Sequence, residues 1–415
     1  MKLATIVAMR IIQISDISFT FYHSEQKYSK KHTIRLFCVI LSPDMTERFR
    51  EDEFSRLELK LSNCLENYRY FRSKLRPETK MLVLVKANAY GHGAVQFAQM
   101  MRDAGADYLA VAYPVEGVEL RKHGIMSPIL VLTTGSDSFN DIVDYHLEPG
   151  IPNLDTLKAL VQVLRNKHIS EYPIHLKLDS GMHRLGFMSS ELEELLAYLR
   201  GNSTVRVKSV YSHLAVADDP QNDVYTLGQV ELFTRNSELI ASSLGYMPMR
   251  HILNSAGIER FPQFQFDMVR LGIGIYGVSA VPGVKLAPVA SLKCKILQIK
   301  HLKPEDGCIG YGLWGKIAPE GSTIATIPVG YADGLDRHLG RGRASFLLNG
   351  KRVPTIGNIC MDMCMLDISG VDAEVGDTVT IFGEDPSVNE LAEILGTIPY
   401  EILTSVPRRI ERVLV

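Results

Sequence analysis

Between about residues 80 and 275, short runs of β-branched and other apolar residues alternate with stretches whose apolar residues recur every three or four positions. The first pattern is typical of buried strands and the second of amphipathic helices. Their alternation predicts βα units and a parallel sheet. We expect eight strands, at Met81–Lys86, Asp107–Ala112, Pro128–Leu132, His146–Glu148, Pro173–Asp179, Val205–His213, Arg250–Asn254 and Asp267–Gly272.

Helical patterns fill the intervals between these strands. The clearest are Val95–Asp103, Leu154–Lys167, Glu191–Arg200 and Tyr225–Leu244. Eight parallel strands in so short a segment favour an α/β fold of the (β/α)8 TIM-like barrel type, which we place at residues 55–280 with its first strand near residue 81. In such barrels the catalytic groups lie at the C-terminal ends of the strands.

Beyond about residue 285 the pattern changes to alternating strands and tight turns. Asn349-Gly350 is a strong hairpin signal between Phe346–Leu348 and Lys351–Val353. One clear helix is predicted to begin after Ser387, with Glu390 completing a capping box, and to stop at Gly396. Residues 285–415 are therefore expected to form a C-terminal, mostly antiparallel β-domain. The other expected strands are Ser291–Gln298, Thr323–Val329, Ala344–Leu348, Asp362–Ile368 and Thr378–Phe382.

Composition excludes several classes of protein. The chain has 415 residues, 46% of them hydrophobic, and a formal net charge of −2. This composition excludes disorder as the main state of the chain. The near-neutral net charge does not indicate a nucleic-acid-binding protein. No apolar run is long enough to span a membrane. The six cysteines lack the close spacing of a zinc site or a disulfide scaffold, so we expect no metal and a reducing, cytoplasmic location.

Residues 1–44 differ from the rest, because six basic residues there stand against three acidic ones. A secretory signal is one interpretation, but Arg10 interrupts the short apolar stretch Leu3–Met9. We favour a poorly ordered tail, or an extension upstream of a true start at Met45. No functional role is assigned to this segment.

Candidate chemistry first appears at Lys86, which follows the apolar run Val83-Leu84-Val85. One interpretation is a lysine whose ammonium group extends to solvent at the barrel mouth. The other is a Schiff-base lysine whose pKa is lowered by desolvation so that it attacks an aldehyde. The strand end alone leaves both open.

The glycines of Gly272-Ile273-Gly274-Ile275-Tyr276-Gly277 match the letters of a dinucleotide-binding fingerprint. However, Val278–Val284 contains Pro282 rather than the start of a helix, and no acidic residue stands about 20 positions further on. The dinucleotide interpretation fails. These glycines instead favour close approach of backbone N–H groups to a phosphate, as in the last strands of many barrels.

From about Leu57 to the C-terminus the chain carries a series of eight motifs. They are, in order, Lys86-Ala87-Asn88-Ala89-Tyr90-Gly91, Lys177-Leu178-Asp179-Ser180-Gly181-Met182-His183-Arg184-Leu185-Gly186, Tyr211-Ser212-His213-Leu214-Ala215, Asn254-Ser255, Val269-Arg270-Leu271-Gly272-Ile273-Gly274-Ile275-Tyr276-Gly277, Gly310-Tyr311-Gly312, Val329-Gly330-Tyr331-Ala332-Asp333-Gly334 and Ile359-Cys360-Met361-Asp362. The series resembles the alanine racemase family. The resemblance implies a pyridoxal 5'-phosphate enzyme that interconverts L-alanine and D-alanine through an aldimine. It also implies a homodimer with composite active sites and a supply of D-alanine for peptidoglycan.

The resemblance further implies a role for each matched residue. Racemisation needs acid–base groups on opposite faces of the α-carbon, and these would be Lys86 and Tyr311 of the partner subunit. Arg270 would face the pyridine nitrogen and, unable to accept its proton, would leave the ring unprotonated, with His213 orienting Arg270 by a hydrogen bond. The full set of implied cofactor-binding residues is Lys86, Tyr90, Arg184, His213, Asn254, Ser255, Arg270, Gly272, Ile273 and Arg408.

The substrate would meet Arg184, Tyr331, Met361 and Asp362, with Met361 and Asp362 on the partner chain and Tyr331 lining the entrance of the pocket. Lys177 matches a position that many family members carbamylate. Arg408 is a departure, because gapless counting from Tyr400-Glu401 places it where many members have a tyrosine that touches the phosphate. This departure puts strictness for alanine in doubt.

Three rival functions stay open on the sequence. A broad-specificity or serine/alanine racemase lies within the same class. A fold-related amino-acid decarboxylase is less favoured because Arg270 occupies the ring-nitrogen position. A non-catalytic pyridoxal-phosphate-binding protein would resemble only the barrel, and the β-domain with Tyr311 argues against it.

Overall fold

The computed structural model describes residues 54–279 and 281–415, so the predictions for residues 1–44 lie outside the described part of the chain. Eight parallel strands form one sheet in the order β8-β7-β6-β5-β4-β3-β2-β9. Backbone hydrogen bonds from Asp267 N to Arg250 O and from Arg270 N to Leu253 O join its two edges. The fold is the expected TIM-like barrel. Its strands are β2 (Lys80–Leu84), β3 (Tyr108–Val111), β4 (Ile129–Val131), β5 (Glu148–Ile151), β6 (Tyr172–Lys177), β7 (Val205–Tyr211), β8 (Met249–His251) and β9 (Met268–Leu271).

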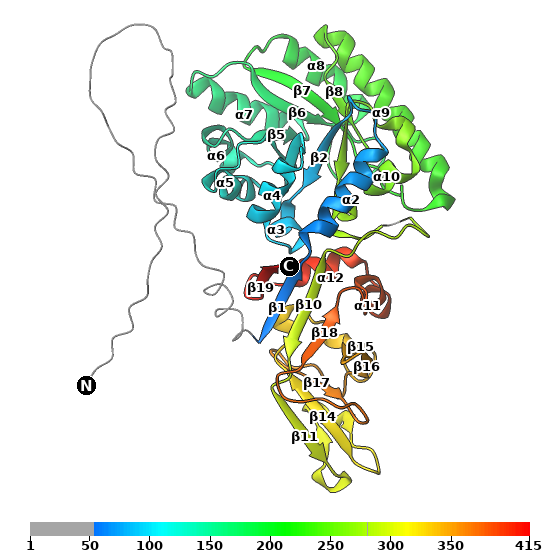
Figure 1. Cartoon of the computed structure of the whole chain (residues 1–415). Coiled ribbons are helices and arrows are strands. Elements are labelled where there is room, and N and C mark those ends of the chain that lie inside the picture. Colours follow the sequence, from blue (N-terminus) through cyan, green and yellow to red (C-terminus); the bar gives the residue numbers. More distant parts are fainter. Residues whose placement is uncertain (1–53, 280) are drawn as a thin grey trace, which may run out of the picture. The chain divides into compact units, whose positions relative to one another are not determined.

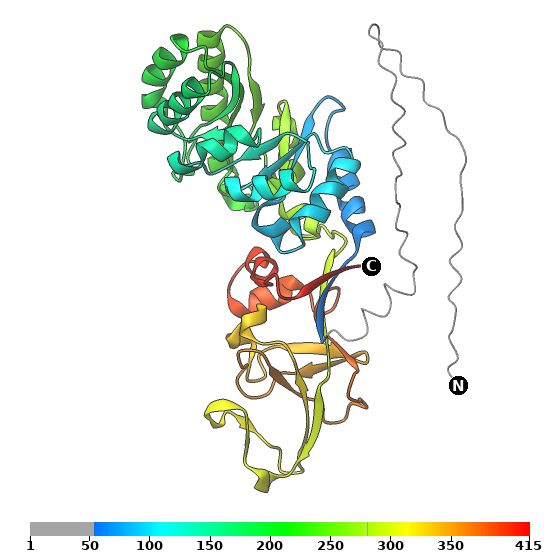
Figure 2. The same cartoon turned by 90° about the vertical axis from the view of Figure 1, so that its left-hand side faces the viewer.

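Helices surround these strands, as Figures 1 and 2 show. In α7, capped by the Asn153 side chain, the buried residues Leu157, Leu160, Val161 and Leu164 follow the spacing of one helix face. No helix of the described residues is long and apolar enough to cross a bilayer. The helices of this part are α2 (Leu61–Ser73), α3 (Lys86–Tyr90), α4 (Ala94–Asp103), α5 (Pro114–Lys122), α6 (Phe139–Asp144), α7 (Leu154–Asn166), α8 (Leu192–Arg200), α9 (Asp223–Leu244) and α10 (Ser255–Arg260).

The C-terminal part is the expected, mostly antiparallel β-domain. A six-stranded sheet has the order β16-β15-β18-β10-β1-β19, and a three-stranded sheet has the order β11-β14-β17. Its strands are β10 (Ala290–Lys295), β11 (Gln298–Leu302), β12 (Cys308–Ile309), β13 (Gly315–Lys316), β14 (Ser322–Ile327), β15 (Ser345–Leu348), β16 (Lys351–Pro354), β17 (Cys364–Asp367), β18 (Thr378–Phe382) and β19 (Glu411–Leu414), and its helices are α11 (Val388–Leu395) and α12 (Pro399–Ser405).

One strand of this sheet comes from the N-terminal side of the barrel. β1 (Ser55–Leu59) pairs antiparallel with β10 and parallel with β19, and Figure 1 shows it in blue beside them. It therefore lies outside the barrel, although residues 55–280 were assigned to the barrel on sequence. The physical reason is its alternation: Leu57 and Leu59 are buried while Arg56 and Glu58 are less so, which suits a half-exposed sheet rather than a barrel strand.

Local signals give mixed results. The Asn349-Gly350 turn is confirmed, with positive φ at both residues and Leu348 paired to Lys351. The Ser387 cap and the Gly396 stop of α11 are also confirmed. The strand expected at His146–Glu148 is displaced, because α6 ends at Asp144 and His146, two residues later, has φ +50°, so β5 begins only at Glu148. Helix α12 was missed.

Candidate active site

A cavity of about 570 Å³ opens at the C-terminal ends of the barrel strands. This is the expected place for a barrel active site, and the volume is in the usual range for a small-molecule pocket. The cavity wall contains cations, hydroxyls and aromatic rings as well as aliphatic side chains. Residues predicted from sequence that line it are Lys86, Tyr90, Lys177, Arg184, His213, Asn254, Ser255, Arg270, Gly272 and Ile273.

Lys86 is followed by a turn of left-handed helix. Ala87, Asn88, Ala89 and Tyr90 have φ between 51° and 55°, a conformation that costs about 1–2 kcal/mol for each non-glycine residue. Backbone hydrogen bonds from Ala89 N to Val85 O and from Gly93 N to Asn88 O close the turn. The strain is therefore held by local bonds at the point where the chain leaves β2.

Two side chains tie this turn to its surroundings. Glu116 of α5 accepts a 2.6 Å hydrogen bond from Ala87 N and also bonds Ala112 N and Tyr113 N. The Asn88 side chain accepts from Ala94 N, the first residue of α4. Glu116 thus holds the backbone beside Lys86, a role that the sequence did not indicate.

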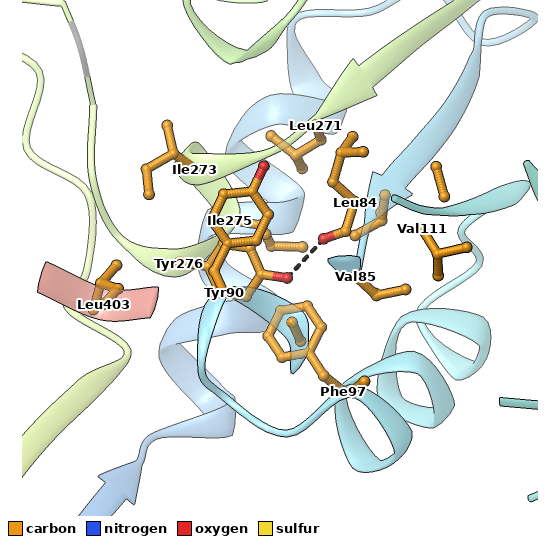
Figure 3. Packing of buried hydrophobic residues seen from close by; sticks show 14 of the residues in the cluster. Leu84, Val85, Tyr90, Phe97, Val111, Leu271, Ile273, Ile275, Tyr276 and Leu403 are labelled. Atoms are coloured by element: carbon orange, nitrogen blue, oxygen red, sulfur yellow. Dashed lines mark hydrogen bonds between the residues drawn. The ribbon is translucent and has the colours of Figure 1, made fainter. Parts of the chain in front are cut away.

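The turn directs the Tyr90 ring onto Tyr276, with ring centroids 4.7 Å apart, and Figure 3 shows the two rings stacked. The Tyr276 hydroxyl donates to Leu84 O at 2.7 Å, which fixes its ring. A Cβ atom on Gly272 would lie 3.2 Å from the Tyr90 hydroxyl. Glycine at this position therefore lets the tyrosine hydroxyl come close to the backbone after β9.

Ser255, at the start of α10, completes the same corner. Its Oγ accepts hydrogen bonds from Gly272 N at 3.0 Å and Gly274 N at 3.2 Å. Since a serine hydroxyl keeps one O–H donor, Ser255 and Tyr90 can both donate to an anion in the cavity. This corner has the chemistry of a phosphate cradle.

Burial and neighbouring cations act on both lysines of the cavity. Burial lowers the pKa of Lys86, the Arg184 charge lowers it further, and the Glu116 carboxylate opposes the shift. Burial and the charges of Arg184 and Arg270 lower the pKa of Lys177 to about 8. Each amine is thus more easily neutral, and more nucleophilic, than a lysine in water.

Arg270 lies at the floor of the cavity, only 4% exposed. Its Nη atoms bond the carbonyls of Ser212, His251 and Ile252, and both Nη atoms contact a histidine: Nη1 meets His251 Nδ1 at 3.0 Å and Nη2 meets His213 Nδ1 at 3.0 Å. Burial lowers the Arg270 pKa to about 10. The expected hydrogen bond between His213 and Arg270 is present.

Guanidinium N–H groups only donate, so both histidines must accept through Nδ1 and carry their proton on Nε2. Burial and the Arg270 charge lower the pKa of His213 and of His251 well below its ordinary value. Arg270 is thus a fixed cation between two neutral imidazoles. His251 was not singled out on sequence.

Tyr400 of α12 reaches the cavity, with its ring centroid 5.9 Å from that of Tyr90. Burial raises its pKa to about 12, so the hydroxyl stays protonated and donates. Arg408, predicted for this place, instead pairs with Glu119 of α5 at 2.9 Å and does not line the cavity. The gapless count from Tyr400 reached Arg408, which lies beyond the end of α12 at Ser405. Tyr400, in the first turn of α12, is the residue that lies beside Tyr90 of α3.

Four predicted residues lie on the β-domain and not at the cavity. Tyr311 is 72% exposed and Met361 55%; Tyr331 is also exposed, and Asp362 pairs with Arg409 at 2.7 Å. Tyr331 and Met361 belong to adjoining segments, joined by a hydrogen bond from Ala332 N to Met361 O. One chain therefore brings the barrel residues together but not these four.

The Tyr311 backbone is nevertheless firmly held. Buried Asn358 donates through Nδ2 to Tyr311 O at 2.8 Å and accepts from Arg341 Nε at 2.8 Å, and the Arg341 guanidinium lies 3.8 Å from the Trp314 ring centroid. The Tyr311 side chain is thus presented outward from a structured loop.

Family models agree with the two-part fold. A model described as alanine racemase, N-terminal domain, matches residues 59–280, and one described as alanine racemase, C-terminal domain, matches residues 289–414.

Curated relatives and solved structures carry the same name. The chain is 36% identical over 370 residues to an alanine racemase of Synechocystis, covering 86% of this chain and 98% of that protein, and 38% identical over 366 residues to one of Desulfovibrio desulfuricans, covering 86% and 97%. It superposes on an alanine racemase of Clostridium difficile 630 with a TM-score of 0.81 at 33% identity, covering 88% and 96% of the two chains. A Bacillus anthracis alanine racemase with bound L-Ala-P gives a TM-score of 0.81 at 32% identity, covering 88% and 95%.

Proposed function

The chain belongs to the alanine racemase family, and from this premise we propose that it interconverts L-alanine and D-alanine with pyridoxal phosphate, using Lys86 and the Tyr311 of a partner subunit as the two bases. The observation that carries the proposal is the barrel cavity, where Lys86, Arg270 and the Tyr90–Ser255 corner face one space. An amine, a buried guanidinium and an anion cradle suit an aldehyde, a ring nitrogen and a phosphate.

Pyridoxal phosphate, when bound, supplies an electron sink for the bond to the α-hydrogen. Lys86 would hold its aldehyde carbon, which the lowered pKa of the amine favours. Tyr90, Ser255 and Tyr400 would donate hydroxyl hydrogens to the phosphate, with Asn254, Gly272 and Ile273 in the adjoining wall.

Proton transfer would use one group on each face of the α-carbon. Lys86 Nζ lies in the barrel and would take or return the proton on its own face. The opposite face needs a second group, and Tyr311 is exposed on the β-domain instead of lining the cavity of its own chain. A second copy that inserts Tyr311 Oη into the barrel mouth would supply it, which is why we propose a homodimer with composite sites.

Arg270 would restrain the reaction to racemisation. Its guanidinium donates and does not accept, so it leaves a facing pyridine nitrogen unprotonated. A weaker electron sink limits side reactions such as transamination and argues against the decarboxylase alternative. The five hydrogen bonds of Arg270 use only Nη1 and Nη2, so Nε–H is the donor left for the cofactor.

Lys177 would carry a carbamate that orients Arg184, the residue proposed to bind the cofactor's phenolic oxygen or the substrate carboxylate. The neutral amine attacks the carbon of CO₂ and releases one proton, which converts a buried cation into an anion. A pKa of about 8 makes the required neutral form accessible near neutral pH. The charges of Arg184 and Arg270 beside Lys177 would stabilise the product.

Alanine is the favoured substrate. The doubt over strictness rested on Arg408, and we propose that Tyr400, which lines the cavity, serves in its place. An aromatic ring there, with Tyr331, Met361 and Asp362 from the partner, would crowd side chains larger than a methyl group. Serine adds only a hydroxyl, and such a difference is worth about 1–3 kcal/mol, so a serine/alanine racemase is the alternative.

The resemblance also leads us to propose a cytoplasmic enzyme that supplies D-alanine for peptidoglycan. The test of the core proposal is a chiral assay of the purified protein on L-alanine, L-serine and L-lysine, with and without added pyridoxal phosphate. D-alanine formed only with the cofactor supports it. Release of CO₂ or equal turnover of all three substrates would contradict it.

The shared site has its own test. Co-expression of Lys86→Ala and Tyr311→Phe chains gives mixed dimers in which one of the two sites keeps both native groups. Random assembly should then restore about a quarter of wild-type activity, although each variant alone is inactive. No recovery would contradict the composite site.

A further inference from the structure

A buried chain of hydrogen bonds crosses the interior of the barrel beneath the cavity. It joins side chains from five adjacent strands, β5 to β9, in one line. Lys208 Nζ bonds Glu148 Oε1 at 2.7 Å, and Glu148 Oε2 meets His175 Nε2 at 2.8 Å. The line continues from His175 Nδ1 to Ser209 Oγ at 2.6 Å, from Ser209 Oγ to His251 Nε2 at 2.8 Å, and from His251 Nδ1 to Arg270.

The direction of every bond follows from the arginine. Because Arg270 only donates, His251 Nδ1 accepts, so the His251 proton is on Nε2 and goes to Ser209 Oγ. The serine hydroxyl then has to donate to His175 Nδ1, which leaves the His175 proton on Nε2, directed at Glu148. One orientation satisfies all four bonds, and it ends on a carboxylate.

Burial makes this chain costly to break. His175, Ser209 and His251 are fully buried, and Glu148 is 8% exposed. The Tyr211 ring lies parallel to His251 with centroids 5.1 Å apart, and the Arg270 guanidinium lies 5.7 Å from the same ring centroid. Arg270 has no carboxylate among its hydrogen-bond partners in the described residues, so Glu148 is the anion to which its hydrogen-bonded chain leads.

Glu148 is kept ionised at the far end. Burial raises its pKa, but the hydrogen bonds from His175 and Lys208, together with the Lys208 charge, outweigh burial and lower it overall. Tyr108, Arg121 and Tyr172 are the other titratable groups that interact with it electrostatically. A charged acceptor at one end and a charged donor at the other polarise the neutral groups between them.

We propose that Glu148, through His175, Ser209 and His251, is the remote positioning anion of Arg270, and that it stabilises the His251 tautomer that accepts the hydrogen bond from the guanidinium. The inference deepens the proposed function and rests on it, because the role of Arg270 at the cofactor's ring nitrogen is part of that proposal. Glu148 and Ser209 are positioning residues, because neither lines the cavity.

Glu148→Gln tests the polarity of the chain without changing its shape. Glutamine has one oxygen and one NH₂ group, and the Lys208 ammonium, which only donates, will take the oxygen. The NH₂ group then faces His175 and reverses the chain, so that His251 acquires a proton on Nδ1 against Arg270. Adding Lys208→Met removes the ammonium group that holds the glutamine oxygen. The oxygen can then accept from His175, which restores the original direction of the hydrogen-bond chain.

The readout is the ¹⁵N spectrum of histidine-labelled full-length protein, with the His251 signals assigned by their loss in His251→Gln. We expect the Nε2–H tautomer in the wild type, the Nδ1–H form or a mixture in Glu148→Gln, and recovery in Glu148→Gln/Lys208→Met. The dissociation constant for pyridoxal phosphate should rise about tenfold in the single variant, the size of one charge-assisted hydrogen bond, and fall back in the double variant.

Glu58→Gln is the matched control. Glu58 is a similarly buried carboxylate, paired with Lys293 at 2.6 Å and Arg56 at 2.8 Å, in the β-domain sheet. It should leave His251 and the cofactor affinity unchanged. Ser209→Ala, which cuts the chain at its centre, should also mix the tautomers, and it serves if Glu148→Gln fails to fold.

An unchanged His251 tautomer in both Glu148→Gln and Ser209→Ala, or the same change in Glu58→Gln, would overturn the proposal. These outcomes are separate from the proposed function, because the tautomer is read without turnover. A wild-type chain that failed to racemise alanine would instead overturn the proposed function.

Discussion

The two halves of the proposed site differ in how far their side chains are exposed. One half is the barrel mouth, by which we mean the cavity at the C-terminal ends of the barrel strands, and the other is the β-domain surface around Tyr311. At the mouth, Arg270 and Lys177 are 4% and 8% exposed and act on one another across a single cavity. Around Tyr311, the side chains of Tyr311, Leu313, Trp314 and Met361 are each more than half exposed; we call these four residues the Tyr311 face. An exposed apolar group of this kind is typical of an interface.

This difference in exposure suggests which part of the proposed function one chain provides and which part needs a second copy. The mouth is arranged to hold a cofactor by itself, because its cations, hydroxyls and glycines meet within one chain. The Tyr311 face is ordered, through Asn358 and Arg341, but its four residues do not line the cavity at the barrel mouth. An ordered and exposed apolar face is the reason to expect that another copy docks there.

Lys86→Ala should produce the largest effect, because it removes both the attachment point and one base. We expect racemisation to fall by a factor on the order of 10³ or more, with loss of the absorbance band of the protein-bound cofactor. Dimer mass should stay unchanged, since the change lies within the mouth. A retained band would contradict the attachment role.

Tyr311→Phe should remove the second proposed base, which the partner subunit contributes. We expect a loss of about 10² to 10⁴ in turnover, with cofactor binding unaltered because the residues proposed to hold the cofactor line the barrel cavity and do not include Tyr311. The α-deuterium isotope effects measured from L-alanine and from D-alanine should become unequal, since only one face loses its base. Equal effects in both directions would contradict the two-base scheme.

Sequence reasoning reached the mouth well because its residues follow directly on strand ends. Lys86, Lys177 and Arg270 stand in short apolar runs, and parallel strands bring their C-terminal ends together. The left-handed turn at Ala87–Tyr90 was beyond prediction, because nothing in alanine or tyrosine favours positive φ. The bonds that hold the turn include a long-range one, from Ala87 N to Glu116, as well as local ones.

Long-range pairings explain the remaining misses. The bond between Glu148 and His175 joins positions 27 residues apart, and that between Lys208 and Glu148 joins positions 60 apart. β1 joins a sheet whose neighbouring strands begin at Ala290 and Glu411. Such contacts have no local signal, so they appear only once the chain is folded.

Lys177 offers a test of charge within the mouth. In CO₂-free buffer near pH 7, most of a lysine with a pKa of about 8 is protonated, and activity should fall about tenfold as Arg184 loses an anionic partner. Bicarbonate should restore activity, and at one fixed concentration of dissolved CO₂ the recovery should be faster at pH 9 than at pH 7, because the neutral amine fraction rises with pH through 8. Lys177→Ala should show no response to bicarbonate; an equal response would rule out this lysine as the site.

Tyr400 is a β-domain residue that reaches the barrel of its own chain, unlike Tyr311. Its substitution is expected to have the smallest effect. Helix α12 packs on the turn after Lys86, because a Cβ atom on Gly91 would clash with Leu403 O. Arg412 of β19 holds the same turn, with Nε donating to Gly91 O at 2.9 Å. Tyr400→Phe removes one hydroxyl donor and keeps the ring, so we expect pyridoxal phosphate to bind about five- to tenfold more weakly, the worth of one hydrogen bond.

Arg408→Ala is the matched control for Tyr400→Phe. It lies on the same segment, but its exposed ion pair with Glu119 is worth at most about 1 kcal/mol of stability. Cofactor affinity and the ratio of L-alanine to L-serine turnover should stay as in the wild type, whereas both should shift in Tyr400→Phe. The reverse result would mean that Arg408, not Tyr400, serves the phosphate, and that α12 moves away from the mouth when the second subunit docks.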